Sequence, residues 1–255
     1  PASDTASAYL RYRHERGQGR YVYAEARASH NRQRFDLGPT AVALGLYGYT
    51  FNSVLREAGN VRPQVRATDA DLTLGIGRDQ GSHSWDAGIS AQRSDVTLAT
   101  PGTVRAEPFI EAAQSLRFLP GFDALPADEA TSLFPSIRNR GLTEQWQGWW
   151  GIQRALMPMR GGNAQLATGI DLRHERWTSH PDTLLSQGDL ALGLPQQQRR
   201  LSRQSGGAYA ELGLPLTSEL RMDLAARWDY DGDYTAFSPR AGLRWTPTPH
   251  WSFLL

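Results

Sequence analysis

The feature that most constrains the fold of this chain is the alternation of side-chain type along residues 219–230. Even-numbered positions hold Leu, Met, Ala, Trp and Tyr, whereas odd-numbered positions hold mainly Glu, Arg and Asp. A helix would mix these two sets around its surface, but a strand turns successive side chains to opposite faces. The alternation therefore predicts a β-strand with one apolar face and one charged face.

The same period-two alternation recurs along the chain, which predicts an all-β protein. Several runs are long for a soluble protein, in which strands most often have about 5–6 residues. The clear runs occupy residues 71–76, 84–91, 145–153, 164–173, 219–230 and 237–245. Weaker runs occupy residues 7–14, 21–31 and 40–51.

The connections between these runs alternate between short and long. Tight turns are expected at residues 79–83, 158–162, 215–218 and 247–250. Long polar connections are expected at residues 99–143 and 178–203, with residues 52–68 and 231–236 on the same side. The first long connection contains helix-like patterns at residues 109–119 and 127–134. Tight turns on one rim and long loops on the other are typical of an outer-membrane β-barrel.

Composition narrows the classes of protein open to such a chain. The 255 residues include no Cys, which excludes disulfides, thiolate metal sites and cysteine nucleophiles. A net charge of +1 gives no electrostatic basis for binding nucleic acid. No run of 18 apolar residues occurs, so no transmembrane helix is expected. The His spacing fits no metal site, and neither a cofactor motif nor a nucleophile elbow is present, so no metal, cofactor or enzyme activity is predicted.

Two all-β architectures have this alternation, the membrane barrel and the soluble sandwich. Long strands favour the barrel, and so does the clustering of aromatic residues at strand ends, where an interfacial girdle would lie. These aromatic residues are Trp146, Trp149, Trp150, Trp177, Trp228, Tyr230, Trp245 and Trp251. An enzyme housed in a barrel remains a rival, since any two carboxylates can meet in space.

The last third of the chain resembles the barrel of TonB-dependent outer-membrane receptors. Residues 169–175 read GIDLRHE, like the family's G-x-[ED]-x-R-x-E strand, and residues 208–216 read AYAELGLPL, like A-Y-A-E-L-x-x-P-L. Residues 220–230, LRMDLAARWDY, are similar to L-x-L-x-L-A-x-R-Y-D-x-Y. Residues 237–247, FSPRAGLRWTP, are similar to S-P-[KR]-x-G-L-R-W-x-P. Residues 1–168 fit the family only by their alternation.

This resemblance implies a place in the outer membrane of a Gram-negative cell, in contact with outer-membrane lipid. It also implies active import of a ferric siderophore or a similar scarce nutrient. In the family, TonB drives this import and engages the receptor through an N-terminal plug domain. The alternatives are a passive outer-membrane porin or adhesin barrel and a soluble all-β binding domain.

The resemblance further implies that the chain is a fragment. Family barrels have about 22 strands, and the pattern here gives about eleven. Residues 1–255 are therefore expected to form a partial antiparallel transmembrane β-barrel, with the plug domain and the C-terminal strands missing. An open barrel has two unpaired edges, so the isolated chain is expected to aggregate in water.

Charged residues on the strands are candidates for the lumen face, because Arg on the lipid face at the midplane costs about 2–4 kcal/mol. These lumen-facing candidates are Asp171, Arg173, Glu175, Arg221, Asp223, Arg227, Asp229, Arg240 and Arg244. Arginines and aromatic residues in the long loops suit an anionic, aromatic ferric siderophore. The ligand-binding candidates are Arg105, Arg117, Phe118, Phe122, Phe134, Arg138, Arg140, Arg199, Arg200 and Arg203.

Overall fold

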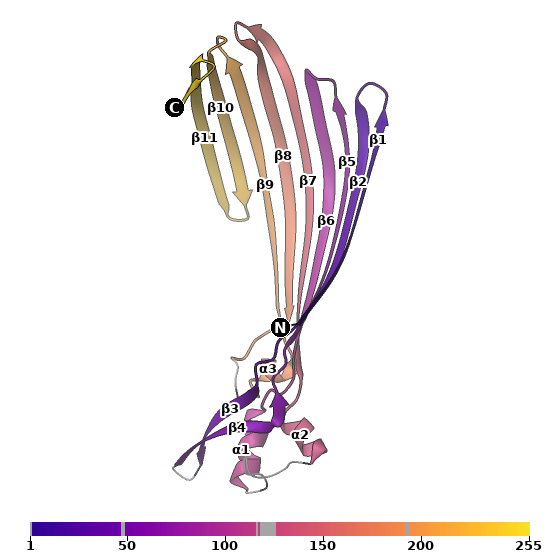
Figure 1. Cartoon of the computed structure of the whole chain (residues 1–255), viewed down its shortest axis with the longest axis vertical. Helices are drawn as coiled ribbons and strands as arrows, with labels where there is room; N and C mark the ends of the chain where they lie inside the picture. The colour runs from indigo at the N-terminus through magenta and orange to yellow at the C-terminus, as the bar shows by residue number, and fades with distance from the viewer. Residues whose placement is uncertain (1, 47–48, 116, 118–125, 192–193) are drawn as a thin grey trace.

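The computed structural model describes residues 2–46, 49–115, 117, 126–191 and 194–255. One antiparallel sheet of ten strands dominates it, and Figure 1 shows these strands side by side along the long axis. The ten strands are β1 (Ala2–Arg16), β2 (Arg20–Arg34), β5 (Gln64–Asp79), β6 (His83–Thr100), β7 (Ile137–Met159), β8 (Gly162–His180), β9 (Arg199–Pro215), β10 (Leu220–Asp231), β11 (Tyr234–Thr248) and β12 (Trp251–Leu254).

A second region, which we call the cap, gathers at the lower end of the sheet in Figure 1. It is built from the connections that follow β2, β6 and β8, so three segments far apart in sequence meet there. Its elements are the hairpin of β3 (Pro39–Leu46) with β4 (Tyr49–Asn60) and the helices α1 (Ala106–Gln114), α2 (Ala127–Leu133) and α3 (Thr183–Gln187).

Strand order in the sheet follows the order of the chain, except that β2 pairs directly with β5 across the β3–β4 hairpin. At the end of the sheet opposite the cap, neighbouring strands are joined by tight turns, such as the one in which Gln18 and Gly19 adopt positive φ. The predicted division into a rim of tight turns and a rim of long connections is confirmed for the connections that follow β2, β6 and β8. It is wrong for residues 231–236, because Asp231 pairs with Tyr234 and a tight turn joins β10 to β11 on the cap side.

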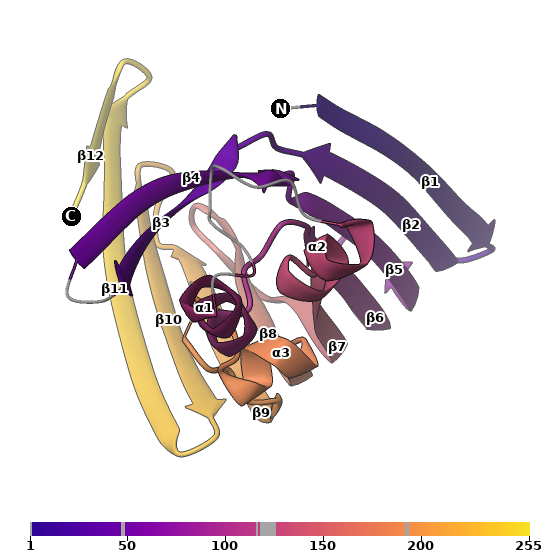
Figure 2. The ribbon, with the colours of Figure 1, turned by 90° about the horizontal axis from the view of Figure 1, so that it is seen from below.

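The sheet is curved into an open trough, which Figure 2 shows end-on. Strands β1 and β12 are its two edges, and within the described residues they do not pair with each other. The structure thus confirms the predicted all-β, partial antiparallel barrel. The described residues contain twelve strands rather than about eleven, of which ten form the wall and two belong to the cap.

The chain between β2 and β5 differs from the prediction. Residues 40–51 were expected to form a strand of the barrel and residues 52–68 a loop, but β3 and β4 pair with each other in a separate two-stranded sheet. The physical reason is that this hairpin buries an apolar side chain within the cap. Leu55 on β4 is fully buried against the residues of α1 and α2.

The predicted loop boundaries also need correction. Residues 137–143 and 199–203 were assigned to loops, yet β7 and β9 already include them. Helix α1 spans Ala106–Gln114 rather than residues 109–119, and α3 was not anticipated. The apolar alternation ends before the strands do, because the strands extend past the apolar part of the wall, where both faces are polar. The alternation of side chains therefore predicts the extent of the apolar band better than it predicts where the strands end.

The continuous register of the sheet fixes which side chains share a face. One face, which we call the apolar face, carries side chains such as Leu74, Ile89, Trp146, Ile170 and Leu172. Ile89 and Leu172 are 61% and 67% exposed, so no side chain among the described residues covers them. A contiguous exposed apolar surface of this kind marks a site of contact with another protein or with a membrane.

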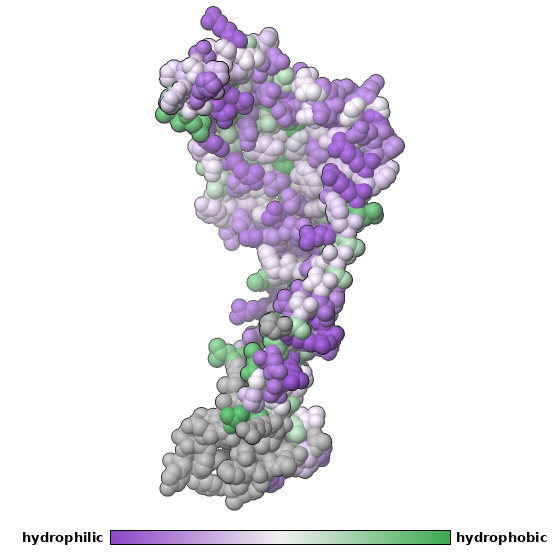
Figure 3. Space-filling model, in the orientation of Figure 1, coloured by the Kyte–Doolittle hydropathy of each residue, from purple (hydrophilic) through white to green (hydrophobic). Residues whose placement is uncertain are grey.

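The opposite face, the polar face, is the concave side of the trough. The trough opens toward the viewer in Figure 1, and the same side is mainly hydrophilic in the upper part of Figure 3. Bulky rings lie over glycines there: a Cβ atom at Gly75 would come within 2.2 Å of the Tyr23 ring, and one at Gly88 within 2.3 Å of Trp149. Glycine at these positions lets aromatic rings lie against the sheet.

Candidate functional site

All nine lumen-facing candidates lie on the polar face. The β8–β9, β9–β10 and β10–β11 registers align Asp171, Gly207 and Asp229, and they place Arg221 opposite Arg244. The remaining candidates are an even number of residues away from these positions on the same strands, so they share the polar face. They are Arg173, Glu175, Asp223, Arg227 and Arg240. The nine residues therefore share one face, and their position in a lumen stays a prediction.

Arg227 connects two carboxylates across the central strand β9. Its Nη2 atom donates to Asp171 Oδ1 on β8 at 3.0 Å, and its Nε donates to Asp229 Oδ1 at 2.7 Å. The guanidinium crosses Gly207, where a Cβ atom would come within 2.4 Å of Nη2. The glycine on β9 is therefore what allows an ion pair to span three strands.

A second charged group on the polar face lies closer to the cap. Arg203 Nη2 donates to Glu175 Oε2 at 2.6 Å and its Nη1 to Asp231 Oδ2 at 3.2 Å. The same guanidinium lies 5.4 Å from the centre of the Trp177 ring. Arg221 similarly pairs with Asp223, at 2.8 Å. Most charges predicted for the lumen are thus partners of one another, which stabilises a polar wall between the strands.

One polar-face cluster was missed by the sequence reasoning. Asp86 on β6 accepts hydrogen bonds from Tyr21 and Tyr23 hydroxyls, each at 3.2 Å, and from Trp149 Nε1 at 2.9 Å. The alternation of the strands could have revealed this cluster, because it places these aromatic residues on the polar face. There a Tyr hydroxyl or a Trp N–H group requires a hydrogen-bond partner. A hollow of about 510 Å³ adjoins this cluster, and its lining includes Tyr209.

The ligand-binding candidates are not gathered into one cluster. Arg105 and Arg117 belong to the cap, whereas Arg138 and Arg140 extend from β7 and Arg199 and Arg200 from β9. By register, Arg138, Arg140 and Arg200 lie on the same side as the apolar face, and Arg199 and Arg203 lie on the polar face. Phe118 and Phe122 lie outside the described residues. Phe134 is buried in the core of the cap.

Arg105 holds two connections of the cap together. Its Nε and Nη2 atoms donate to Asp189 Oδ2 at 2.7 and 2.5 Å, and both side chains are partly buried. Backbone bonds reinforce the contact, from Ala106 N to Asp189 O at 3.1 Å and from Ala191 N to Val104 O at 2.9 Å. The guanidinium that was proposed for a ligand is therefore already bound to a carboxylate.

The other candidate arginines also have local contacts. Arg117 Nε donates to Ser115 Oγ at 3.2 Å, and Arg140 forms a two-pronged pair with Asp95 on β6. The Arg138 backbone N donates to Asp182 Oδ2 at 2.8 Å, while its side chain is exposed. Arg199 and Arg200 are exposed at the start of β9. Their role in ligand binding stays a prediction.

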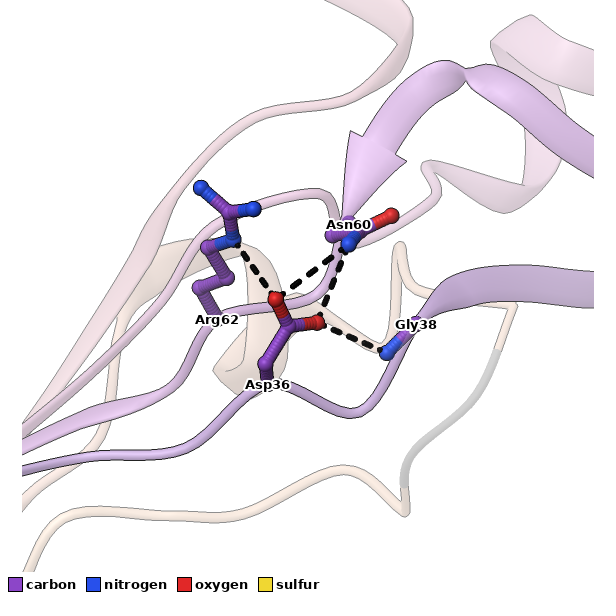
Figure 4. Close-up of polar contacts among 4 residues, drawn as sticks. All are labelled: Asp36, Gly38, Asn60 and Arg62. Atoms are coloured by element: carbon purple, nitrogen blue, oxygen red, sulfur yellow. Dashed lines mark hydrogen bonds and ion pairs between the residues drawn. The ribbon is translucent and has the colours of Figure 1, made fainter. Parts of the chain in front are cut away.

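Another contact that sequence reasoning missed fixes the base of the β3–β4 hairpin (Figure 4). Asp36 accepts bonds from Gly38 N at 3.1 Å, Asn60 Nδ2 at 3.0 Å and Arg62 Nε at 3.1 Å. The Gly38 N–H, followed by the Asn60 amide and Arg62, holds the pKa of Asp36 below its usual range. This carboxylate therefore joins the segments before β3 and after β4.

The described residues contain neither a metal-binding cluster nor a membrane-spanning helix. Across those residues, no cluster of three or more His, Asp or Glu side chains has the geometry to hold a metal ion. Within the same ranges, no helix has both the length and the hydropathy needed to cross a membrane.

A curved sheet with one exposed apolar face and one concave polar face defines a partial barrel of the outer-membrane type. A sequence profile of the family described as TonB dependent receptor-like, beta-barrel, matches residues 4–254. The chain therefore belongs to the TonB-dependent receptor family and forms part of its barrel. No curated protein matches the sequence.

Solved structures show the same fold at low identity. The RagAB peptide transporter matches with a TM-score of 0.63 and 10% identity, over 95% of this chain and 30% of its own. FpvA of P. aeruginosa bound to a pyoverdine matches with a TM-score of 0.52 and 12% identity, over 97% of this chain and 34% of its own. Fiu of E. coli K12, a ferric-catecholate import receptor, matches with a TM-score of 0.50 and 13% identity, over 95% of this chain and 38% of its own. The chain thus spans about a third of their length.

Proposed function

We propose that this chain is one part of the wall of an outer-membrane receptor that imports a ferric siderophore or a similar scarce nutrient. The observation that carries this proposal is the ten-stranded trough with an exposed apolar convex side and a charged concave side. In hydrocarbon every backbone polar group needs a partner, and sheet pairing supplies it without help from water.

The two faces have different roles in this proposal. The apolar face contacts outer-membrane lipid, and the polar face surrounds a plug domain that lies outside this chain. The ion pairs of Arg227 and Arg203 then form a rigid charged lining. The hollow beside Asp86 and Trp149 is a place where the plug contacts this wall.

The nutrient class is supported by chemistry and by analogy. Among the structural neighbours, FpvA is bound to a pyoverdine, and Fiu is a ferric-catecholate import receptor. Of the predicted ligand-binding arginines, Arg199 and Arg203 lie on the polar face near the cap, where an anionic ligand entering the lumen would pass. TonB would supply the energy through the plug domain.

The import proposal is tested with the whole protein that carries this chain, expressed in cells that contain or lack TonB. We expect uptake of a ferric siderophore, followed with radioactive iron, to disappear when TonB is removed. Uptake that persists without TonB would identify a passive porin instead. Saturable surface binding with no uptake in either strain would identify an adhesin or a binding module.

The assignment of the two faces is tested by single-cysteine labelling, which is clean because the chain has no Cys. Ile89→Cys and Ser90→Cys alter neighbouring positions of β6 that lie on opposite faces. In membranes, we expect the cysteine at position 89 to react with a lipid-phase reagent and the one at position 90 with a water-soluble reagent. The reverse pattern would invalidate the assignment.

A further inference from the structure

The apolar face changes character abruptly toward the cap. Along β2 the side chains on this face are Val22, then alanines at 24, 26 and 28, and then His30, Arg32 and Arg34. Along β5 the same face runs from Ile76, Leu74 and Leu72 through Ala70 and Thr68 to Arg66. Cationic residues therefore begin where the apolar band ends on both strands.

The three arginines lie close together. Arg32 lies directly opposite Arg66 in the β2–β5 register, and Arg34 follows two residues later on the same face. Like charges placed directly opposite in a sheet destabilise it. The acidic residue nearest by register is Asp4, opposite Arg32 on β1. Within the ranges that the structure describes, no ion pair neutralises Arg32, Arg34 or Arg66.

Arg32 also has an unmet hydrogen-bonding requirement. Its Nε atom is buried and has no acceptor among the described residues, and such a donor costs free energy until it finds one. Arg66 is exposed, and its Nη2 atom donates to Gln64 Oε1 at 3.1 Å. Arg34 is exposed. The cluster therefore offers several donors to an external acceptor.

We propose that Arg32, Arg34 and Arg66 bind the phosphate group of an outer-leaflet lipid. Guanidinium groups recognise phosphate with paired, charge-assisted hydrogen bonds. A lipid phosphate lies at the edge of the hydrocarbon layer, which is where this cluster stands relative to the apolar band. One phosphate relieves the repulsion between Arg32 and Arg66 and gives Arg32 Nε its acceptor. This inference rests on the proposed membrane location.

The turn end of the same face provides a comparison. Arg16, Arg20 and Arg78 also lie in one row there. Arg78 Nε, however, donates to the Gln18 carbonyl at 3.4 Å, so a backbone acceptor already lies beside this row. We therefore assign the lipid phosphate to the cluster on β2 and β5 nearest the cap.

The test uses the whole protein that carries this chain, purified in a neutral detergent. Three probes are added in turn: lipid A with its phosphates, the same lipid A with its phosphates removed, and inorganic phosphate. Native mass spectrometry measures retained lipid, and thermal melting measures stabilisation. We expect only phosphorylated lipid A to be retained and to raise the Tm, by several degrees. Equal retention of the dephosphorylated lipid, or equal stabilisation by inorganic phosphate, would overturn the proposal.

Two variants sharpen the result. Arg66→Gln should weaken retention of phosphorylated lipid A at least tenfold, whereas Arg240→Gln, which removes one positive charge from the polar face, should leave it unchanged. Arg66→Glu places a carboxylate opposite Arg32, so it should raise the Tm without lipid and abolish the further rise with lipid. Unchanged retention in Arg66→Gln would contradict the assignment.

The labelling of positions 89 and 90 separates the two possible failures. If position 89 is in lipid but lipid A binding does not depend on Arg66, only the phosphate site is wrong. If position 89 is in water, the membrane location itself is wrong and the phosphate site fails with it.

Discussion

The sheet and the cap contain similar apolar residues but use them in opposite ways. The buried hydrophobic residues lie almost entirely in or beside the cap, where Leu55, Phe109 and Phe134 pack together. The wall is far larger, yet Leu74, Ile89 and Trp146 remain exposed on it. The cap is therefore assembled by the hydrophobic effect in water, whereas the wall needs a second solvent to cover its apolar face.

The largest effect should come from removing the lipid or detergent that covers the apolar face of the wall. In detergent or lipid we expect the chain to keep its strand content, measured by circular dichroism. On transfer to water it should aggregate, because the apolar face and the edges β1 and β12 have no cover. A monodisperse chain that melts cooperatively in water would eliminate the difference between wall and cap and would favour a soluble β-domain.

The cap should respond strongly to loss of a core side chain. Phe109 is 2% exposed and its ring lies 6.0 Å from that of Phe134, so Phe109→Ala should destabilise the cap by about 3–5 kcal/mol. The matched control is Ile110→Ala on the same helix, where the side chain is 41% exposed. Hydrogen exchange at cap amides should quicken only in the first variant, and amides of β7 and β8 should not change. Equal effects of both would contradict this core.

The wall should respond to charge on one face only. Ile89→Arg introduces a cation on the apolar face and should cost about 2–4 kcal/mol in a bilayer. Ser90→Arg, one residue along β6, turns to the polar face opposite Thr73 and Gln147 and should cost little. Folding into vesicles across a urea series measures both free energies. If Ser90→Arg proved the more damaging, the two faces would have to be exchanged.

The smallest effect should be a pH dependence at the base of the cap hairpin. Because the pKa of Asp36 is lower in the folded protein than in the unfolded chain, its contribution to stability is complete above the unfolded value. That contribution is lost as the pH falls through the folded value. Asp36→Asn keeps an acceptor oxygen but cannot titrate, so it should remove this dependence. Hydrogen exchange at Val61 N, which donates to Gly38 O, reports it.

Alternation was sufficient to predict the wall, because a half-buried strand carries its burial pattern in every second residue. It predicted the shared face of Asp171, Arg227 and Arg244 and the placement of tight turns on one rim. It failed for residues 40–51, which belong to the separate β3–β4 hairpin of the cap rather than to the wall. Local pattern records that a side chain is buried but not what covers it.

The contacts of the site were less predictable than its faces. Arg105 was chosen for its charge and its loop position, but its partner Asp189 lies 84 residues away and no local pattern links the two. The bonds from Tyr21, Tyr23 and Trp149 to Asp86 likewise depend on the register across several strands. Such pairings follow from the assembled sheet, so a single sequence does not encode them in any short window.

The strand order described above also has a consequence for how the molecule assembles. Each strand of the wall pairs with its nearest wall strand along the chain. Hairpins such as β1–β2 and β7–β8 close short loops, whereas the connections that follow β2, β6 and β8 are long and are closed only when one hairpin pairs with the next. The cap is different, because the Arg105–Asp189 pair and the core around Leu55 join distant segments. Local pairing is kinetically favoured over such distant contacts. The wall can therefore grow hairpin by hairpin, while the cap is completed only after the chain has passed residue 190.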